Sequence, residues 1–169
     1  MKKVNIKEIK GDPWQSPKGK FTVAFTGVSE ALSRGRARES GHRVSDEPKE
    51  RWPFDLELNR MPPGKANFPF HAHSAQWEMY LIVNGKASVR DKDGTTNVAE
   101  GDVFMFGPNE PHQITNSGDV DLVYYVIADN PVGESGYYPD SSKWKMNRNS
   151  QVDRVVIKGS EADYFDGEE

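Results

Sequence analysis

Turn-forming residues recur at short intervals through the middle of this chain of 169 residues, and this feature restricts its fold more than any other. Glycine, proline and asparagine at such intervals end one element and begin the next. The breaks are Pro62-Pro63-Gly64, Asn84-Gly85, residues 91–94, residues 107–111 and Ser117-Gly118. The segments between them are short and rich in β-branched and aromatic residues, which predicts an all-β domain.

The strands are indicated by the alternation of apolar and polar residues. Residues 54–59 alternate with the period of a half-buried strand. Residues 77–83 form a second strand that ends at Asn84-Gly85, a pair typical of a β-hairpin. No long amphipathic helical pattern interrupts the strands, so an antiparallel sandwich or barrel is favoured. In residues 120–128 the side chains expected to point inward are those of Leu122, Tyr124 and Val126.

Composition divides the chain into three parts. Residues 51–130 hold the predicted β-barrel, and the polar residues 131–169 form a C-terminal extension. Residues 1–50 form an N-terminal extension that we expect to pack on the barrel. Each extension contains one candidate strand, at residues 21–25 and at residues 152–157. The length suits one domain with extensions.

Composition also excludes several kinds of site and partner. The chain has no cysteine, which rules out disulfides and thiolate metal sites. A formal net charge of -4 gives no reason to expect nucleic acid as a partner. No stretch approaches the roughly 20 apolar residues of a membrane helix. The first residues lack the apolar run of a secretion signal, so we expect a cytoplasmic protein with no membrane partner.

Three of the four histidines fall within the predicted barrel, beside one glutamate. His71 and His73 are two residues apart, so they share one face of a strand. A turn at residues 74–77 would allow Glu78 to begin the neighbouring strand on the same interior face. His112 follows the turn at residues 107–111 and starts another strand.

Each of these residues has an ordinary explanation when it is taken alone. His71 and His73 could lie on an exposed strand, Glu78 could be a surface carboxylate, and His112 could cap a turn. Together, three imidazoles and one carboxylate suit Fe, Mn, Ni, Cu or Zn, and suit Ca²⁺ or Mg²⁺ poorly. An octahedral ion with four protein ligands keeps two positions open for Lewis-acid or oxygen chemistry.

The spacing of these residues resembles the two sequence motifs of the cupin superfamily. The first motif is H-x-H, three or four residues, E, six residues and G, and its positions here are His71-Ala72-His73, Glu78 and Gly85. The second motif is G, five residues, P-x-G, two residues, H, three residues and N. Its positions here are Gly101, Gly107, Asn109, His112 and Asn116.

Two departures from the motifs are visible, and neither changes a ligand. Gly107 and Asn109 stand where the second motif has proline and glycine. Asparagine tolerates the left-handed backbone, so we expect the turn to survive. Gly64 lies one residue further from His71 than the glycine that precedes the first motif. Residues 137–141 and 163–167 also resemble a group of bacterial single-domain cupins.

The resemblance implies an antiparallel double-stranded β-helix, or jelly-roll barrel, in which one divalent transition metal ion is bound. Its ligands would be His71, His73, Glu78 and His112, and its identity Fe, Mn, Zn or Ni. A small polar or oxygenated molecule would bind inside the barrel at the metal. The residues expected to contact that molecule are Gln76, Trp77, Tyr80 and Tyr124. The resemblance also favours a homodimer.

Three kinds of function remain open. The chain could be a metal-dependent dioxygenase, isomerase or lyase, with Glu78 as the one candidate catalytic base. It could instead bind or sense a small ligand without turnover. It could also be a structural relic whose metal is incidental, although the presence of all four ligand types argues against that.

Overall fold

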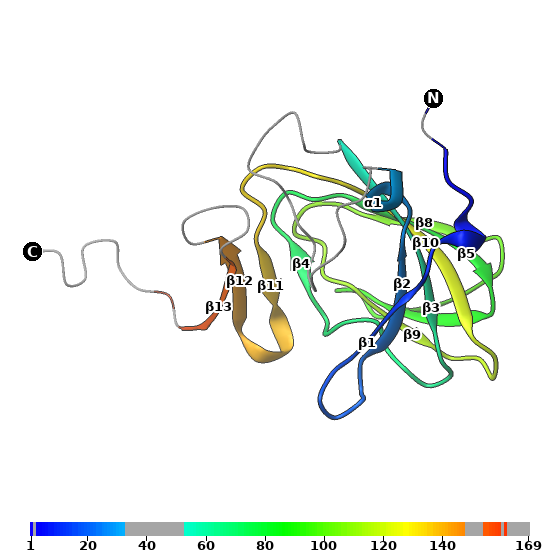
Figure 1. Ribbon diagram of the computed structural model, residues 1–169. Helices are drawn as coiled ribbons and strands as arrows, with labels where there is room; N and C mark the ends of the chain where they lie inside the picture. The colour runs from blue at the N-terminus through cyan, green and yellow to red at the C-terminus, as the bar shows by residue number, and fades with distance from the viewer. Residues whose placement is uncertain (2, 33–52, 148–153, 160, 162–169) are drawn as a thin grey trace, which may run out of the picture.

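The computed structural model describes residue 1 and residues 3–32, 53–147, 154–159 and 161 (Figure 1). Its named strands lie in three sheets, in which all strand pairs are antiparallel. The largest sheet has six strands in the order β1 (Asp12–Gln15), β2 (Thr22–Gly27), β3 (Phe54–Met61), β10 (Leu122–Asp129), β5 (Glu78–Asn84) and β8 (Val103–Phe106).

A three-stranded sheet packs against this large sheet and closes the barrel. Its strands, in order, are β7 (Thr95–Ala99), β6 (Lys86–Arg90) and β9 (Gln113–Asn116). The buried core lies between the two sheets and consists of Met61, Tyr80, Ile82, Ala87, Val89, Ile114, Leu122 and Tyr124. The predicted all-β jelly-roll barrel is therefore confirmed, and so is the inward direction of Leu122 and Tyr124.

A third sheet joins the strands of the C-terminal region to β4. The third sheet has the order β13 (Arg154–Lys158), β12 (Lys143–Asn147), β11 (Gly136–Tyr138) and β4 (Ala72–His73). In the described part of the chain the helical elements are η1 (Ile6–Glu8), α1 (Val28–Leu32) and η3 (Pro139–Ser141). Among the described residues, no helix is both long enough and apolar enough to cross a membrane.

The prediction of a β-hairpin at Asn84-Gly85 is wrong. β5 pairs with β10 and β8, whereas β6 pairs with β7 and β9, so this turn carries the chain from one sheet to the other. Gly85 has a φ of +92°, and a Cβ atom there would lie 3.1 Å from the carbonyl oxygen of Asp121. Glycine is needed at residue 85 because the backbone at the start of β10 leaves no room for a side chain there.

β3 has the predicted alternation, but its polar face points into the barrel. Asn59 is 3% exposed, Met61 is fully buried, and Asp55 and Glu57 share their side of the strand. Leu56 lies on the outer face, where its cross-strand neighbour is Ile127. Part of the interior wall is therefore polar.

The terminal regions are joined to the barrel by strand pairing. β2 overlaps the strand predicted at residues 21–25, and it pairs with β3. β13 overlaps the strand predicted at residues 152–157, whereas residues 163–167 lie outside the described part of the chain. β11 pairs with β4, the short strand that carries His73, so the C-terminal sheet lies beside the barrel (Figure 1). Arg90 on β6 adds two hydrogen bonds of 2.7 and 2.8 Å to Asp140 of η3.

Candidate metal centre

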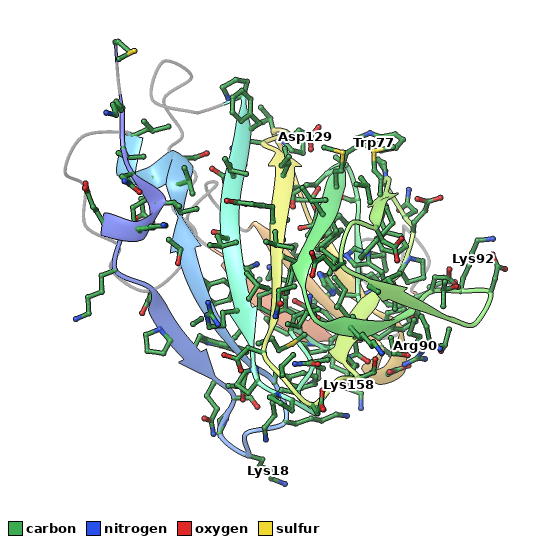
Figure 2. The ribbon with its side chains drawn as sticks, turned by 90° about the vertical axis from the view of Figure 1, so that its right-hand side faces the viewer. Lys18, Trp77, Arg90, Lys92, Asp129 and Lys158 are labelled. Atoms are coloured by element: carbon green, nitrogen blue, oxygen red, sulfur yellow. The ribbon has the colours of Figure 1, made fainter. Side chains whose placement is uncertain are left out.

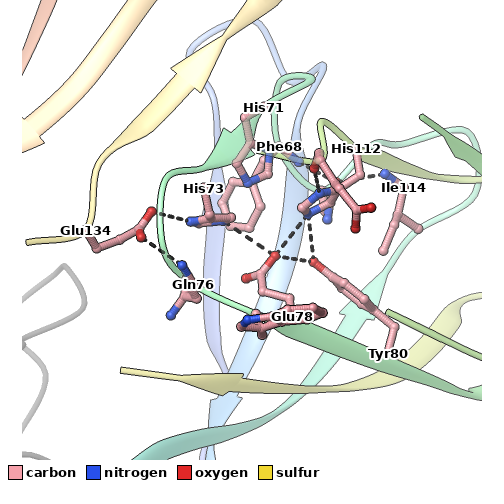
Figure 3. Close-up of polar contacts among 12 residues, drawn as sticks. Phe68, His71, His73, Gln76, Glu78, Tyr80, His112, Ile114 and Glu134 are labelled. Atoms are coloured by element: carbon pink, nitrogen blue, oxygen red, sulfur yellow. Dashed lines mark hydrogen bonds and ion pairs between the residues drawn. The ribbon is translucent and has the colours of Figure 1, made fainter. Parts of the chain in front are cut away.

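Four side chains from three regions of the chain converge inside the barrel. His71 and His73 come from the β4 region, Glu78 begins β5, and His112 precedes β9. Their ligand atoms all lie within 4.8 Å of one another (Figure 3). The backbones of His71 and His112 are paired directly, since the His112 N–H donates to the His71 carbonyl at 2.8 Å and the reverse bond is 3.2 Å. This pairing places the two imidazoles side by side.

The hydrogen bonds of the three imidazoles leave each Nε2 directed toward the cluster. Nδ1 of His71 is 2.8 Å from the Pro69 carbonyl, and Nδ1 of His112 is 3.0 Å from the Glu110 carbonyl. Nδ1 of His73 is 2.9 Å from Glu134 Oε1. Carbonyl and carboxylate oxygens only accept, so each Nδ1 is the donor. Nε2 is then the nitrogen left to coordinate a metal ion in each ring.

The charges at the centre are set by burial and by the two carboxylates. Burial, followed by the nearby His112 and His73, lowers the pKa of His71 to about 3. Burial alone would lower the pKa of His73 as well, but Glu78 and Glu134 outweigh it and raise that pKa to about 9. Although burial opposes ionisation of Glu78, His73 and His112 hold its pKa well below the usual range. At neutral pH the metal-free centre therefore contains an ion pair between His73 and Glu78.

The residues fit a bound transition metal ion. His73 Nε2 is buried without a hydrogen-bond partner, and it lies 3.5 Å from Glu78 Oε2. Glu78 Oε2 is also 3.0 Å from His112 Nε2, so one carboxylate oxygen faces two imidazoles. Three imidazole nitrogens and one carboxylate oxygen form a donor set typical of first-row transition metals. His71, His73, Glu78 and His112 could therefore hold a metal ion together, as the sequence predicted.

Glu134 orients His73 and was not predicted from the sequence. Besides His73 Nδ1, its carboxylate accepts the backbone N–H groups of Ser74, Ala75 and Gln76 at 3.2, 2.9 and 2.9 Å. It also contacts the Ser74 hydroxyl at 3.4 Å. Glu134 thus fixes both one metal-ligand candidate and the turn that leads to Glu78. It lies 61 residues from His73 in a polar stretch, with no local signal of this role.

A cavity of about 170 Å³ opens beside the cluster. An engineered protein cavity of about 150 Å³ holds benzene, so this cavity admits a small organic molecule. Its walls include His71, His73 and Glu78, together with the polar face of β3. The C-terminal region supplies further lining residues, namely Glu134, Tyr138, Lys145 and Met146.

The four residues expected to contact a ligand divide into two pairs. Gln76 and Tyr80 line the cavity. The Tyr80 hydroxyl donates to Glu78 Oε2 at 2.7 Å and lies 3.2 Å from His112 Nε2. Trp77 is not among the lining residues, since its side chain is 48% exposed and lies at the end of the barrel near Asp129 (Figure 2). Tyr124 is also not among them, because it is completely buried in the core.

Trp77 explains why glycine replaces the proline of the second motif. A Cβ atom at Gly107 would lie 2.9 Å from the Trp77 ring, so any larger residue would displace that ring. Asn109 has a φ of +64°, which agrees with the expectation that asparagine adopts the left-handed conformation of the motif glycine. Both departures from the motif therefore preserve the turn before His112.

Comparisons with known sequences agree with this geometry. Residues 58–128 match the family model described as "Cupin domain". An oxalate-binding protein of Thermotoga maritima is 27% identical over 89 residues, which are 53% of this chain and 73% of the relative.

Solved structures give the same result at the level of the fold. A sugar phosphate isomerase of the cupin superfamily from Silicibacter pomeroyi aligns with a TM-score of 0.72 and 18% identity, covering 96% of this chain and 97% of its own. A putative sugar phosphate isomerase from Acidithiobacillus ferrooxidans has a TM-score of 0.71 at 19% identity, with coverage of 90% and 87%. A predicted oxalate decarboxylase from Thermotoga maritima has a TM-score of 0.56 at 23% identity, with coverage of 76% and 98%.

Proposed function

We propose that this chain, which belongs to the cupin superfamily, holds one divalent transition metal ion and transforms a small oxygenated molecule beside it. The metal ligands in this proposal are His71, His73, Glu78 and His112, and the ion is Fe, Mn, Zn or Ni. One observation carries the proposal: four donor atoms lie within 4.8 Å of one another, and three of their residues line a cavity large enough for a small molecule.

The bound ion would supply Lewis-acid polarisation for an isomerase or lyase, or oxygen activation for a dioxygenase. The protein itself supplies orientation and a base. Tyr80 donates to Glu78 and keeps its carboxylate in place. An ionised carboxylate at the cavity wall can accept a proton from a bound molecule, so Glu78 is the candidate catalytic base.

Metal analysis tests the first half of this proposal. The protein is produced without a histidine tag, purified without chelator and analysed for its elements. We expect about one equivalent of Fe, Mn, Zn or Ni in the wild type and none in His73→Ala. His42, the fourth histidine, lies outside the motifs and the described residues, so His42→Ala is the matched control and should keep its metal. A wild type that binds none of these four ions would contradict the proposal.

A second candidate is binding of a small ligand without turnover. This candidate is supported by the sequence similarity to a Thermotoga maritima protein that is named an oxalate-binding protein. Incubation of the metal-loaded protein with aldoses, ketoses and small carboxylic acids, followed by NMR spectroscopy, separates the two candidates. Product signals that disappear in Glu78→Gln support the enzyme, whereas saturable binding without product supports the ligand-binding protein.

A further inference from the structure

The two oxygens of the Glu78 carboxylate lie in different surroundings. Oε2 is 2.7 Å from the Tyr80 hydroxyl, 3.0 Å from His112 Nε2 and 3.5 Å from His73 Nε2. Within the described part of the chain, every hydrogen bond and ion pair of this carboxylate is made by Oε2, as the dashed lines of Figure 3 show. Oε2 is therefore the oxygen that a metal ion shared with the two imidazoles would bind.

Oε1 is the oxygen of Glu78 that faces the cavity. The Glu78 side chain lines the cavity and is 14% exposed. Oε1 makes no hydrogen bond to a described residue, yet it is not one of the buried side-chain atoms that lack a partner, so the accessible part of the carboxylate includes it. A carboxylate oxygen accepts and does not donate. A molecule in the cavity thus meets Oε1 as an acceptor, while Oε2 is turned toward the imidazoles.

Tyr80 determines which oxygen takes which place. Its ring is 2% exposed and stacks on Phe104, with the two centroids 5.2 Å apart and the rings 10° from parallel. Close packing of this kind keeps a side chain in one rotamer, so the hydroxyl donates from a fixed point. Tyr80 and Glu78 are two residues apart on β5 and share its inner face. Each carboxylate oxygen has about two acceptor positions, so Oε2 can accept from Tyr80 and bind an ion at once.

We propose that Tyr80 holds Glu78 as a one-oxygen metal ligand, so that Oε1 serves as the base toward a small carbonyl compound that carries a proton on the carbon beside its carbonyl group. The inference rests on the proposed function and specifies its substrate class. A metal ion that polarises a carbonyl makes this neighbouring proton acidic. Removal of the proton then requires a base within hydrogen-bond reach, and Oε1 is placed at the cavity for that task.

The proton transfer needs no further reactant. Oε1 takes the proton, the electron pair of the broken C–H bond forms a carbon–carbon double bond, and the π pair of the carbonyl moves to its oxygen. Return of a proton to either carbon completes an isomerisation or an exchange with solvent. Because no oxidant is consumed, this chemistry is that of an isomerase or lyase.

Tyr80→Phe is the test variant, since it removes the hydroxyl and keeps the stacked ring. Tyr125→Phe, at the groove on the outer face of β10, is the matched control. Elemental analysis at saturating zinc gives the metal content. The infrared spectrum of each zinc-loaded protein, minus that of Glu78→Gln, isolates the two stretching bands of the Glu78 carboxylate. Coordination through one oxygen separates these bands more widely than coordination through both.

Exchange of the carbon-bound protons of hydroxyacetone in D₂O, followed by NMR spectroscopy, measures the base. The protein is loaded in turn with Fe, Mn, Zn and Ni. We expect widely separated bands and metal-dependent exchange in the wild type. Tyr80→Phe should keep about one zinc, show a narrower separation and exchange about 100-fold more slowly, because a positioned general base contributes about 10²- to 10⁴-fold. Tyr125→Phe should match the wild type in all three measurements.

Four results would overturn the inference. They are narrowly separated bands in the wild type, the same separation in Tyr80→Phe as in the wild type, no exchange with any of the four ions bound, and loss of zinc from Tyr80→Phe. The last would mean that the hydroxyl is needed to hold the ion and does not merely orient the carboxylate. A wild type that binds none of the four ions contradicts the proposed function instead, so the two failures are distinguishable.

Discussion

His73 lies between two carboxylates, and its proton must leave before a metal ion can bind. Glu78 and Glu134 raise its pKa to about 9 despite burial, so the metal-free centre carries an imidazolium at pH 7. The ion pair also stabilises the metal-free fold. Because the pKa is raised, that stabilisation is complete below about pH 6.5, the ordinary value, and is lost as the pH rises through about 9.

We therefore predict that binding of one metal ion at pH 7 releases about one proton. An imidazole with the ordinary pKa of about 6.5 would release roughly a quarter of a proton at this pH. Titration calorimetry in two buffers of different ionisation enthalpy measures the number. The apparent metal affinity should rise with pH until about pH 9, because protons compete with the ion below that value. Release of less than half a proton at pH 7 would contradict the raised pKa of His73.

Replacing Glu134 tests how much the orientation of His73 contributes to metal binding, because Glu134 holds His73 but is not itself a candidate metal ligand. Glu134→Gln keeps the shape but loses the charge that holds His73 and the backbone of residues 74–76. We predict a fall in metal affinity of about 10- to 100-fold and a loss of about 2 kcal/mol in the free energy of unfolding. Competition with a chromophoric chelator and urea denaturation give the two values. Glu100→Gln, on an exposed turn, is the control, and unchanged affinity in Glu134→Gln would exclude an orienting role.

At the scale of elements, the contact between Gly107 and Trp77 limits which residue the loop after β8 can hold at position 107. A methyl group at residue 107 would lie 2.9 Å from the Trp77 ring. We predict that Gly107→Ala destabilises the wild type by about 1–2 kcal/mol, as overpacking does. In a Trp77→Ala background the same change should cost close to nothing, because the space is then free. Urea denaturation of the two single variants and the double variant measures the coupling, and additive effects would show that the contact does not restrict residue 107.

Elements whose signals are local could be predicted from the sequence, and those set by distant contacts could not. Alternation and turn residues are local, so the barrel strands were found, and motif spacing located the four metal-ligand candidates. The pair Asn84-Gly85 has the same local signature in a hairpin as in a crossing between sheets. Alternation in β3 indicates that its faces differ, but it does not indicate which one points inward. Glu134 acts on His73 across 61 residues, a contact that exists only once β11 pairs with β4.

At the scale of the whole molecule, the β8 edge of the six-stranded sheet is exposed and apolar. Val103 is 59% exposed and Met105 55% exposed, and β5 adds Leu81 and Val83 beside them. Within the described part of the chain, β8 has no strand on its outer side. An open strand edge with apolar side chains favours pairing with another chain. A second copy related by a twofold axis would place β8 against β8 and cover both patches.

The homodimer expected from the sequence stays a prediction, and this edge is where we expect its interface. Size-exclusion chromatography with light scattering should give the mass of two chains for the wild type and of one chain for Met105→Lys. Val132→Lys, at a site 71% exposed in a loop, is the control and should remain dimeric. A monomeric wild type would contradict the prediction, and a dimeric Met105→Lys would place the interface elsewhere.

The position of Glu134 beyond the last barrel strand has a consequence for biosynthesis. All four metal-ligand candidates lie within residues 58–128, the part matched by the family model, whereas Glu134 and the Tyr138 ring stacked on His71 follow it. During translation the ligands leave the ribosome before the groups that hold them. A nascent chain ending near residue 130 would have every donor and a poorly oriented His73. Metallation should therefore become tight only when synthesis has passed β11.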